Sequence, residues 1–169
     1  MTRCHHRAEP DPNGRPTMSL EAESLFVVGV LRAWVAEHQP KPGEGPDWRQ
    51  IFVLASLPAE AAAAFGSFMT LVRQSLRRQL DIRCCPCPQL GRDEEALLRI
   101  LGAVQAGDRL AALDELGGWL LPGNLTPALR SADTLAALLA LHDVRLPRVS
   151  VPAELLARGD ADGPHRMLQ

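Results

Sequence analysis

Tyrosine is absent from this sequence of 169 residues, and aromatic residues make up only 4% of it. The core must therefore be built mainly from leucine, alanine and valine, which suit the packing of helices better than the pleated surface of a sheet. The hydrophobic fraction of 46% and the charged fraction of 22% are typical of a globular domain. We predict an all-α protein, folded as an irregular bundle of roughly five or six helices.

The sequence also lacks an excess of either charge, because its formal net charge is −2. Such a balance provides no overall field to attract nucleic acid or an anionic membrane, so we predict no nucleic-acid partner. Residues 1–17 contain prolines, arginines, histidines and acidic residues, but no apolar run like that of a signal peptide. We therefore predict a cytoplasmic protein in which the four cysteines stay reduced.

Motifs that mark common catalytic sites are missing as well. The sequence contains no P-loop, no G-x-G-x-x-G, no H-E-x-x-H and no G-x-S-x-G. His38, His142 and His165 are scattered, without a carboxylate at the spacing of a metal-ligand pair. We predict a protein that is not an enzyme and that has no cofactor.

Proline and glycine divide the chain into three parts. Residues 1–17 and 147–169 have too few apolar residues to form a core, so we predict a disordered N-terminal arm and a disordered C-terminal tail. Residues 18–146 form the predicted helical domain, because their apolar residues recur at helical spacing. The predicted helices cover about residues 19–38 with Ser19 as N-cap, 58–80, 93–106, 108–121 with Asp108 as N-cap, and 126 onwards.

One apolar stretch, residues 51–72, is long enough to span a membrane and carries a single charged side chain, Glu60. Its strongly apolar residues favour insertion by only about 4 kcal/mol, and a central carboxylate costs about 3 kcal/mol. Pro58 and several polar residues remove the remainder. We therefore predict that this stretch is the buried centre of the bundle and does not span a membrane, although peripheral membrane contact stays an alternative.

Three of the four cysteines, Cys84, Cys85 and Cys87, stand within four positions of each other. Thiolates are soft ligands for zinc or copper, and the C-x-x-C spacing of Cys84 and Cys87 allows two sulfurs to converge on one ion. Cys85 is a candidate third ligand, and further ligands would have to come from Cys4-His5-His6 in the arm. This pattern predicts a metal site, although Pro86 limits the turns available to it.

The same cysteines allow two other interpretations. The pattern C-x-P-C occurs in thioredoxin-like redox sites, but there it follows a strand and opens a helix, whereas here Pro88 follows Cys87 directly. Alternatively, the thiols only pack, as small buried hydrophobic groups in a tight turn. In that case we expect Cys85 to point towards the core and to tolerate substitution least.

Four arginines before and beside the cysteines form a predicted basic edge: Arg73, Arg77, Arg78 and Arg83. Four cations without interleaved aromatic residues are a weak signal for nucleic acid, so we expect a solvated face. The acidic residues Asp93-Glu94-Glu95, which suit the first turn of a helix, are candidate partners for this edge.

The middle of the chain resembles a group of small helical proteins of Proteobacteria that have a C-C-x-C cluster before a D-E-x-x-L-L helix. The residues that carry the resemblance are Phe65-Gly66, Arg73, Cys84-Cys85-Pro86-Cys87, Asp93-Glu94 and Leu97-Leu98. The resemblance covers about a third of the chain and implies no activity. It implies only that the cysteine cluster and the helix after it form a recurring unit.

These observations predict a helical interaction or regulatory module, whose partner is another protein or a second copy of the chain. The alternative prediction is a metal-binding or thiol-sensing protein that works through Cys84, Cys85 and Cys87.

Overall fold

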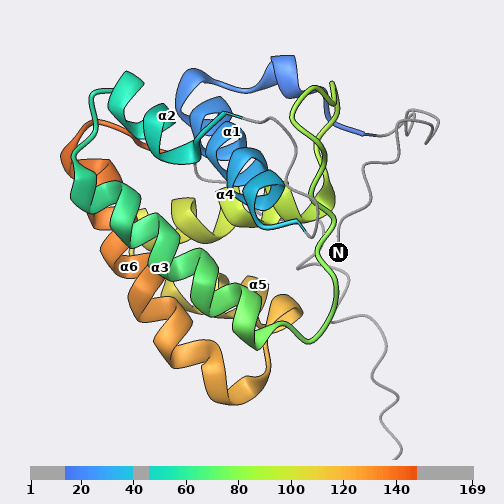
Figure 1. The fold of residues 1–169 in the computed structure, drawn as a ribbon. Coiled ribbons are helices and arrows are strands. Elements are labelled where there is room, and N and C mark those ends of the chain that lie inside the picture. Colours follow the sequence, from blue (N-terminus) through green and yellow to red (C-terminus); the bar gives the residue numbers. More distant parts are fainter. Residues whose placement is uncertain (1–13, 40–45, 148–169) are drawn as a thin grey trace, which may run out of the picture.

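The computed structural model describes residues 14–39 and 46–147 of the protein. These residues form six α-helices and two short 3-10 turns, and they contain no strand beyond two isolated bridges, so the all-α prediction is confirmed (Figure 1). The elements in chain order are η1 (Thr17–Ser19), α1 (Ala22–Glu37), α2 (Trp48–Leu54), α3 (Ala59–Ser75), α4 (Arg92–Gln105), α5 (Arg109–Trp119), η2 (Pro122–Asn124) and α6 (Leu125–Leu141).

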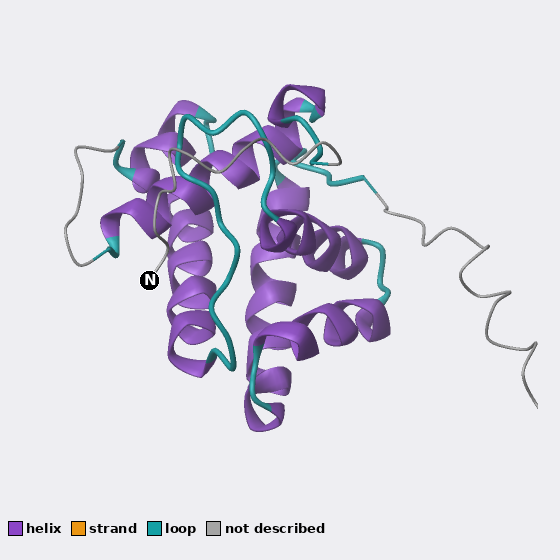
Figure 2. Cartoon of the chain, turned by 90° about the vertical axis from the view of Figure 1, so that its right-hand side faces the viewer, coloured by secondary structure: helices purple, strands orange, loops and turns teal. Residues whose placement is uncertain are grey.

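The helices form an irregular bundle. α3 lies antiparallel along α6, while α4 packs against α5, α6 and α1, and α2 packs on α1 and the start of α3 (Figures 1 and 2). The core between them is built from leucine, valine and alanine, together with Trp119, Phe52 and Phe68. Burial of one apolar face from each helix is what stabilises such short helices, because they are marginal in isolation.

The apolar stretch 51–72 is divided between two helices. Leu54 ends α2, Ser56 adopts a positive φ of 57°, and α3 begins after Pro58, which suits the position before a first helical turn. In the part of the chain that the structure describes, no helix combines the length and the apolar character that a membrane crossing requires.

Local side-chain bonds explain several helix starts. The Asp47 carboxylate accepts a hydrogen bond from the Arg49 amide at 2.9 Å, and the Asp108 carboxylate accepts one from the Ala111 amide at 3.1 Å. Each bond satisfies an amide that has no partner within its own helix. The predicted cap at Asp108 is therefore confirmed.

Two predicted boundaries are wrong. Ser19 is not the N-cap of α1, because its hydroxyl donates to the Pro16 carbonyl at 2.7 Å within η1, and α1 begins after Glu21. α3 ends at Ser75 and not near residue 80. There the backbone turns extended and pairs with the end of α5: the Arg77 amide donates to the Trp119 carbonyl at 2.9 Å.

The last residues of the predicted arm belong to the domain. The Arg15 carbonyl accepts a hydrogen bond from the Leu90 amide at 2.9 Å, and the Thr17 amide donates to the Pro88 carbonyl at 2.7 Å. The rest of the predicted arm, and the predicted tail beyond residue 147, lie outside the described residues.

Candidate functional site

The cysteine loop, residues 76–91, joins α3 to α4. It contains no helix and runs as an extended segment beside the bundle (Figures 1 and 2). Two neighbouring carboxylates in the first turn of α4, Asp93 and Glu94, are only 1% and 0% exposed and bind this loop. Buried carboxylates are costly unless they are paired and hydrogen-bonded, so their partners define how the loop is held.

Glu94 joins the loop to α1 through a buried ion pair. Its Oε1 and Oε2 accept from Nε and Nη2 of Arg32 at 2.7 and 2.8 Å, and they also accept from the amides of Arg83 and Gly91 at 3.0 and 2.8 Å. Burial alone would lower the pKa of Arg32, but the hydrogen bonds and the charge of Glu94 outweigh it and raise that pKa. Glycine is needed at position 91, because a Cβ there would collide with the Asp81 carbonyl oxygen.

The other N–H groups of Arg32 donate to the turn that carries the cysteines. Its Nη1 donates to the Cys87 carbonyl at 2.7 Å and to the Cys85 carbonyl at 3.4 Å, and its Nη2 donates to the Gln89 carbonyl at 2.9 Å. The planar guanidinium therefore fixes three loop carbonyls and one carboxylate at the same time.

Asp93 holds the other end of the loop. Its carboxylate accepts from Nη1 and Nη2 of Arg78 at 2.7 and 2.6 Å, from the Asp81 amide at 2.6 Å and from the Trp119 indole N–H at 2.9 Å. Burial alone would raise the pKa of Asp93, but these hydrogen bonds and the charge of Arg78 outweigh it and hold that pKa below its ordinary value.

The lowered pKa of Asp93 predicts a pH dependence of stability. The stabilisation is complete above the pKa of an unfolded aspartate, about 3.9, and is lost as the pH falls through the lower pKa of the folded state. We expect the free energy of unfolding to fall more steeply below pH about 4 in the wild type than in Asp93→Asn. Urea titrations at a series of pH values measure this difference, and parallel curves for the two proteins would contradict it.

The exposure of one cysteine, Cys85, differs from the prediction. Cys84 and Cys87 are half-buried, whereas Cys85 is exposed, so the expectation that Cys85 points towards the core is wrong. The reason is that Cys85 stands at the corner of a turn, which the hydrogen bond from the Cys87 amide to the Cys84 carbonyl closes.

No three histidine, cysteine or acidic side chains within residues 14–39 and 46–147 are grouped so that they could hold a metal ion. A zinc or copper site at Cys84, Cys85 and Cys87 would therefore need ligands from elsewhere in the chain. The candidates that the sequence offers, Cys4 and its neighbours, lie outside the described residues.

The predicted basic edge is only partly a solvated face. Arg73 and Arg77 are exposed, whereas Arg78 pairs with the acidic first turn of α4, as the alternative interpretation expected. Arg83 makes a half-exposed ion pair with Asp81 at 3.4 Å. Of the four arginines, Arg78 thus holds the cysteine loop to α4, and Arg83 pairs within the loop.

A groove runs along α3, between this helix and α1, α2 and the first residues of the cysteine loop. It consists of three adjoining hollows of about 580, 270 and 290 Å³. The first two share Trp34 and His38, and the first and third share Trp48, Arg49 and Ala63. We call the three hollows together the α1–α3 groove.

Aromatic and cationic side chains form one wall of the groove. The rings of Trp34 and His38 stack with their centroids 3.9 Å apart, and the Arg49 guanidinium carbon lies 4.3 Å from the centroid of the Trp48 ring. Trp48 rests on Gly66, where a Cβ would come within 3.0 Å of the indole. Among the described residues the Trp48 indole N–H has no acceptor.

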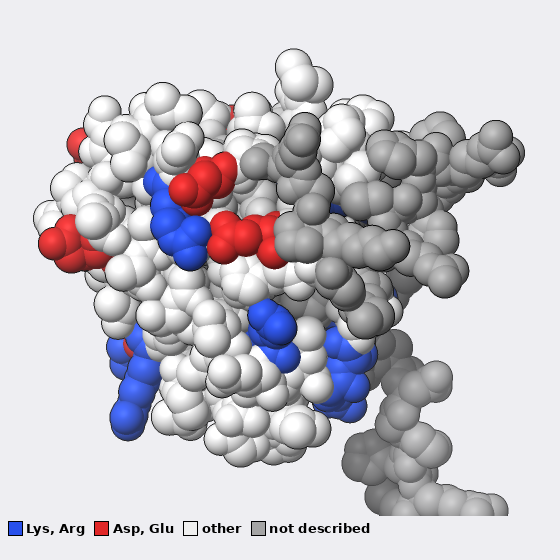
Figure 3. All heavy atoms as spheres, in the orientation of Figure 1, with Lys and Arg blue, Asp and Glu red and all other residues white. Residues whose placement is uncertain are grey.

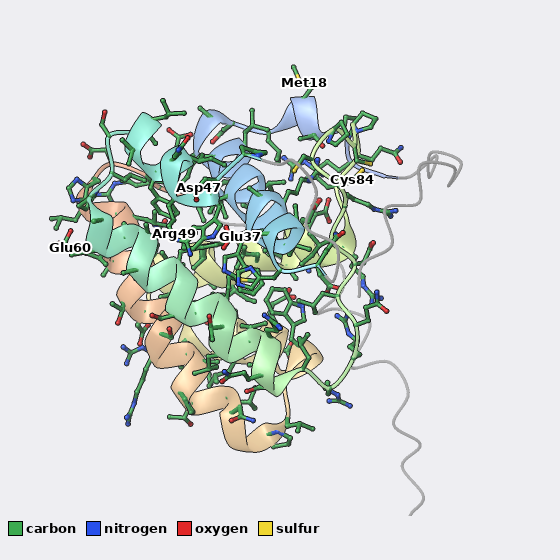
Figure 4. The ribbon with its side chains drawn as sticks, viewed as in Figure 1. Met18, Glu37, Asp47, Arg49, Glu60 and Cys84 are labelled. Carbon is green, nitrogen blue, oxygen red and sulfur yellow. The ribbon has the colours of Figure 1, made fainter. Side chains whose placement is uncertain are left out.

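The opposite wall is the outer face of α3. Its first part carries small side chains at helical spacing, namely Ala59, Ala63, Gly66, Ser67 and Thr70, and larger side chains such as Leu71 and Gln74 follow towards the end of α3. Figure 3 shows a mostly uncharged surface here, and Figure 4 places Glu37, Asp47 and Arg49 together beside it, where Arg49 pairs with both carboxylates.

Neither the role of Arg32 nor the groove was predicted from the sequence. Arg32 is the one cationic residue in the apolar helix α1, and it is 4% exposed. A single cation among apolar residues indicates a buried ion pair, so the sequence did contain a signal for it. The groove had no such signal, because it arises from residues on three separate helices and on the cysteine loop.

No family model, curated protein or solved structure matches this chain. The resemblance to helical proteins of Proteobacteria therefore stays a prediction.

Proposed function

We propose that this protein is a helical interaction module, and that the α1–α3 groove is its binding surface. The observation that carries the proposal is the groove itself, a concave surface with stacked aromatic side chains on one wall and small side chains on the other. Recognition of an amphipathic helix in an apolar groove is a common mode of protein interaction.

The shape of the groove favours a helix as its occupant. The groove follows α3, whose 17 residues span roughly 25 Å, so a partner helix with a similar number of residues would extend along its whole length. Small residues at helical spacing along α3 let a second helix approach closely. Aromatic and arginine side chains are the types that contribute most to binding energy at protein interfaces. In this groove Arg49 and Arg73 are exposed, whereas Trp34 and Trp48 are each only 4% exposed.

The charges favour an acidic occupant. Of the described residues, two arginines line the hollows, Arg49 and Arg73, and no carboxylate lines them. Arg73 is exposed and makes no ion pair with the described residues. We therefore propose a partner helix with an apolar face flanked by glutamates, so that its charges meet these cations.

A labelled synthetic peptide tests the proposal. The peptide has about 18 residues, with leucines at helical spacing and glutamates beside them, and fluorescence anisotropy measures its binding. We expect Arg73→Glu and Thr70→Glu to weaken binding about tenfold or more through charge repulsion. Arg130→Glu on the exposed part of α6, which lines none of the three hollows, is the matched control and should bind normally.

Two outcomes would contradict this function. Equal binding of a peptide with lysines in place of the glutamates would show that the arginines of the groove do not select an acidic partner. Sedimentation of the protein as a dimer that Thr70→Glu dissociates would show that the groove binds a second copy of the chain.

We also propose that the protein acts in the cytoplasm and has no catalytic role. Three thiols close together in one loop suit a reducing compartment, where a disulfide between them is only transient.

A further inference from the structure

Cys84 and Cys87 are the two ends of one β-turn. The Cys87 amide donates to the Cys84 carbonyl at 3.0 Å, and such a turn keeps the Cα atoms of its end residues within about 7 Å. A disulfide requires a Cα separation of about 4.4 to 6.8 Å, so the turn brings the pair close to bridging distance. Neighbouring Cys84 and Cys85 do not meet this range, because consecutive Cα atoms are only about 3.8 Å apart.

The turn is held on a rigid support. Arg32, itself 4% exposed, binds the carbonyls of Cys85 and Cys87, and Glu94 fixes Arg32 in turn. The Arg32 guanidinium also lies close enough to interact electrostatically with the sulfurs of Cys84 and Cys87. A thiol pair on a fixed turn loses little conformational freedom when it closes into a disulfide.

We propose that Cys84 and Cys87 form a thiol–disulfide exchange site for small-molecule disulfides, a role that goes beyond the proposed binding function. The thiolate of one cysteine attacks a sulfur of the small disulfide, whose S–S bond breaks and releases one thiolate, which takes up a proton from water. The thiolate of the other cysteine attacks the protein sulfur of the mixed disulfide and expels the second small thiolate. The protein pair loses two electrons, and the small disulfide gains them.

Cys85 is outside the exchanging pair. It stands exposed at the corner of the turn, next to Pro86. Its replacement by serine should therefore leave the exchange intact, which makes it the matched control for the other two cysteines.

The experiment uses the full chain, reduced and then exposed to glutathione disulfide, with mass spectrometry after alkylation. We expect wild type and Cys85→Ser to lose the two thiol hydrogens of Cys84 and Cys87 and to carry little glutathione on either of these two residues, as located by peptide mapping. Cys84→Ser and Cys87→Ser should carry about tenfold more glutathione on the remaining partner, because the intramolecular second step is missing. Circular dichroism confirms that each variant is folded, and Cys84→Ala and Cys87→Ala repeat the test without a hydroxyl.

The proposal is overturned if Cys84 carries as much glutathione in the wild type as in Cys87→Ser. It is also overturned if Cys85→Ser fails to close the disulfide, which would place Cys85 in the pair. Either result leaves the α1–α3 groove and its peptide test unaffected, because no cysteine lines the groove among the described residues.

Discussion

Replacing Arg32 with methionine is expected to lower the free energy of unfolding by about 3 to 5 kcal/mol. The substitution leaves the Glu94 carboxylate buried without its cation, and it removes the donor that binds three carbonyls of the cysteine loop. A total stability of about 5 to 15 kcal/mol makes this loss large. Urea unfolding followed by circular dichroism measures it.

Two variants show whether the loss comes from burial of an unpaired charge. Arg49→Met breaks an exposed ion pair with Glu37, so we expect it to cost less than about 1 kcal/mol. The double variant Arg32→Met with Glu94→Leu removes both charges and should recover part of the stability. The account is contradicted if Arg32→Met and Arg49→Met are equally stable.

Leu101→Asp is expected to unfold the domain. Leu101 has no exposed surface on α4, which packs against three other helices, so the new carboxylate would be buried without a partner. The cost of several kcal/mol approaches the whole stability of a domain. Thermal melts measure the effect.

Leu110→Asp is the matched control, because it makes the same chemical change at a leucine that is 80% exposed. We expect it to alter the melting temperature little, and the same holds for Arg77→Ala, whose exposed side chain donates a hydrogen bond to the Gly117 carbonyl at 3.2 Å. Comparable losses in Leu101→Asp and Leu110→Asp would mean that the faces of these helices are misassigned.

The helices were predictable from the sequence because their signals are local. Apolar spacing identified α4, and the capping residue Asp108 marked the start of α5. The end of α3 was not predictable, because the backbone after Ser75 bonds to Trp119 and neighbouring residues more than 40 positions away. Such a tertiary contact overrides local helix propensity.

The candidate sites were less predictable than the helices. The sequence identified the cysteine cluster and the possibility that the basic edge pairs with Asp93, but not the burial of Glu94 or its bond to Arg32, 62 positions away. The exposure of Cys85 depends on the turn that Arg32 supports. The groove depends on how α1, α2, α3 and the start of the cysteine loop are placed, which no local sequence pattern indicates.

Amide hydrogen exchange tests most directly whether two buried carboxylates fix the cysteine loop to the bundle. The amides of Asp81, Arg83 and Gly91 lie outside any helix, yet each donates to Asp93 or Glu94. We predict that all three exchange much more slowly than amides in an unstructured peptide, and that Glu94→Gln speeds exchange at Arg83 and Gly91 more than at Asp81. Exchange of these three amides at unstructured rates in the wild type would contradict the account.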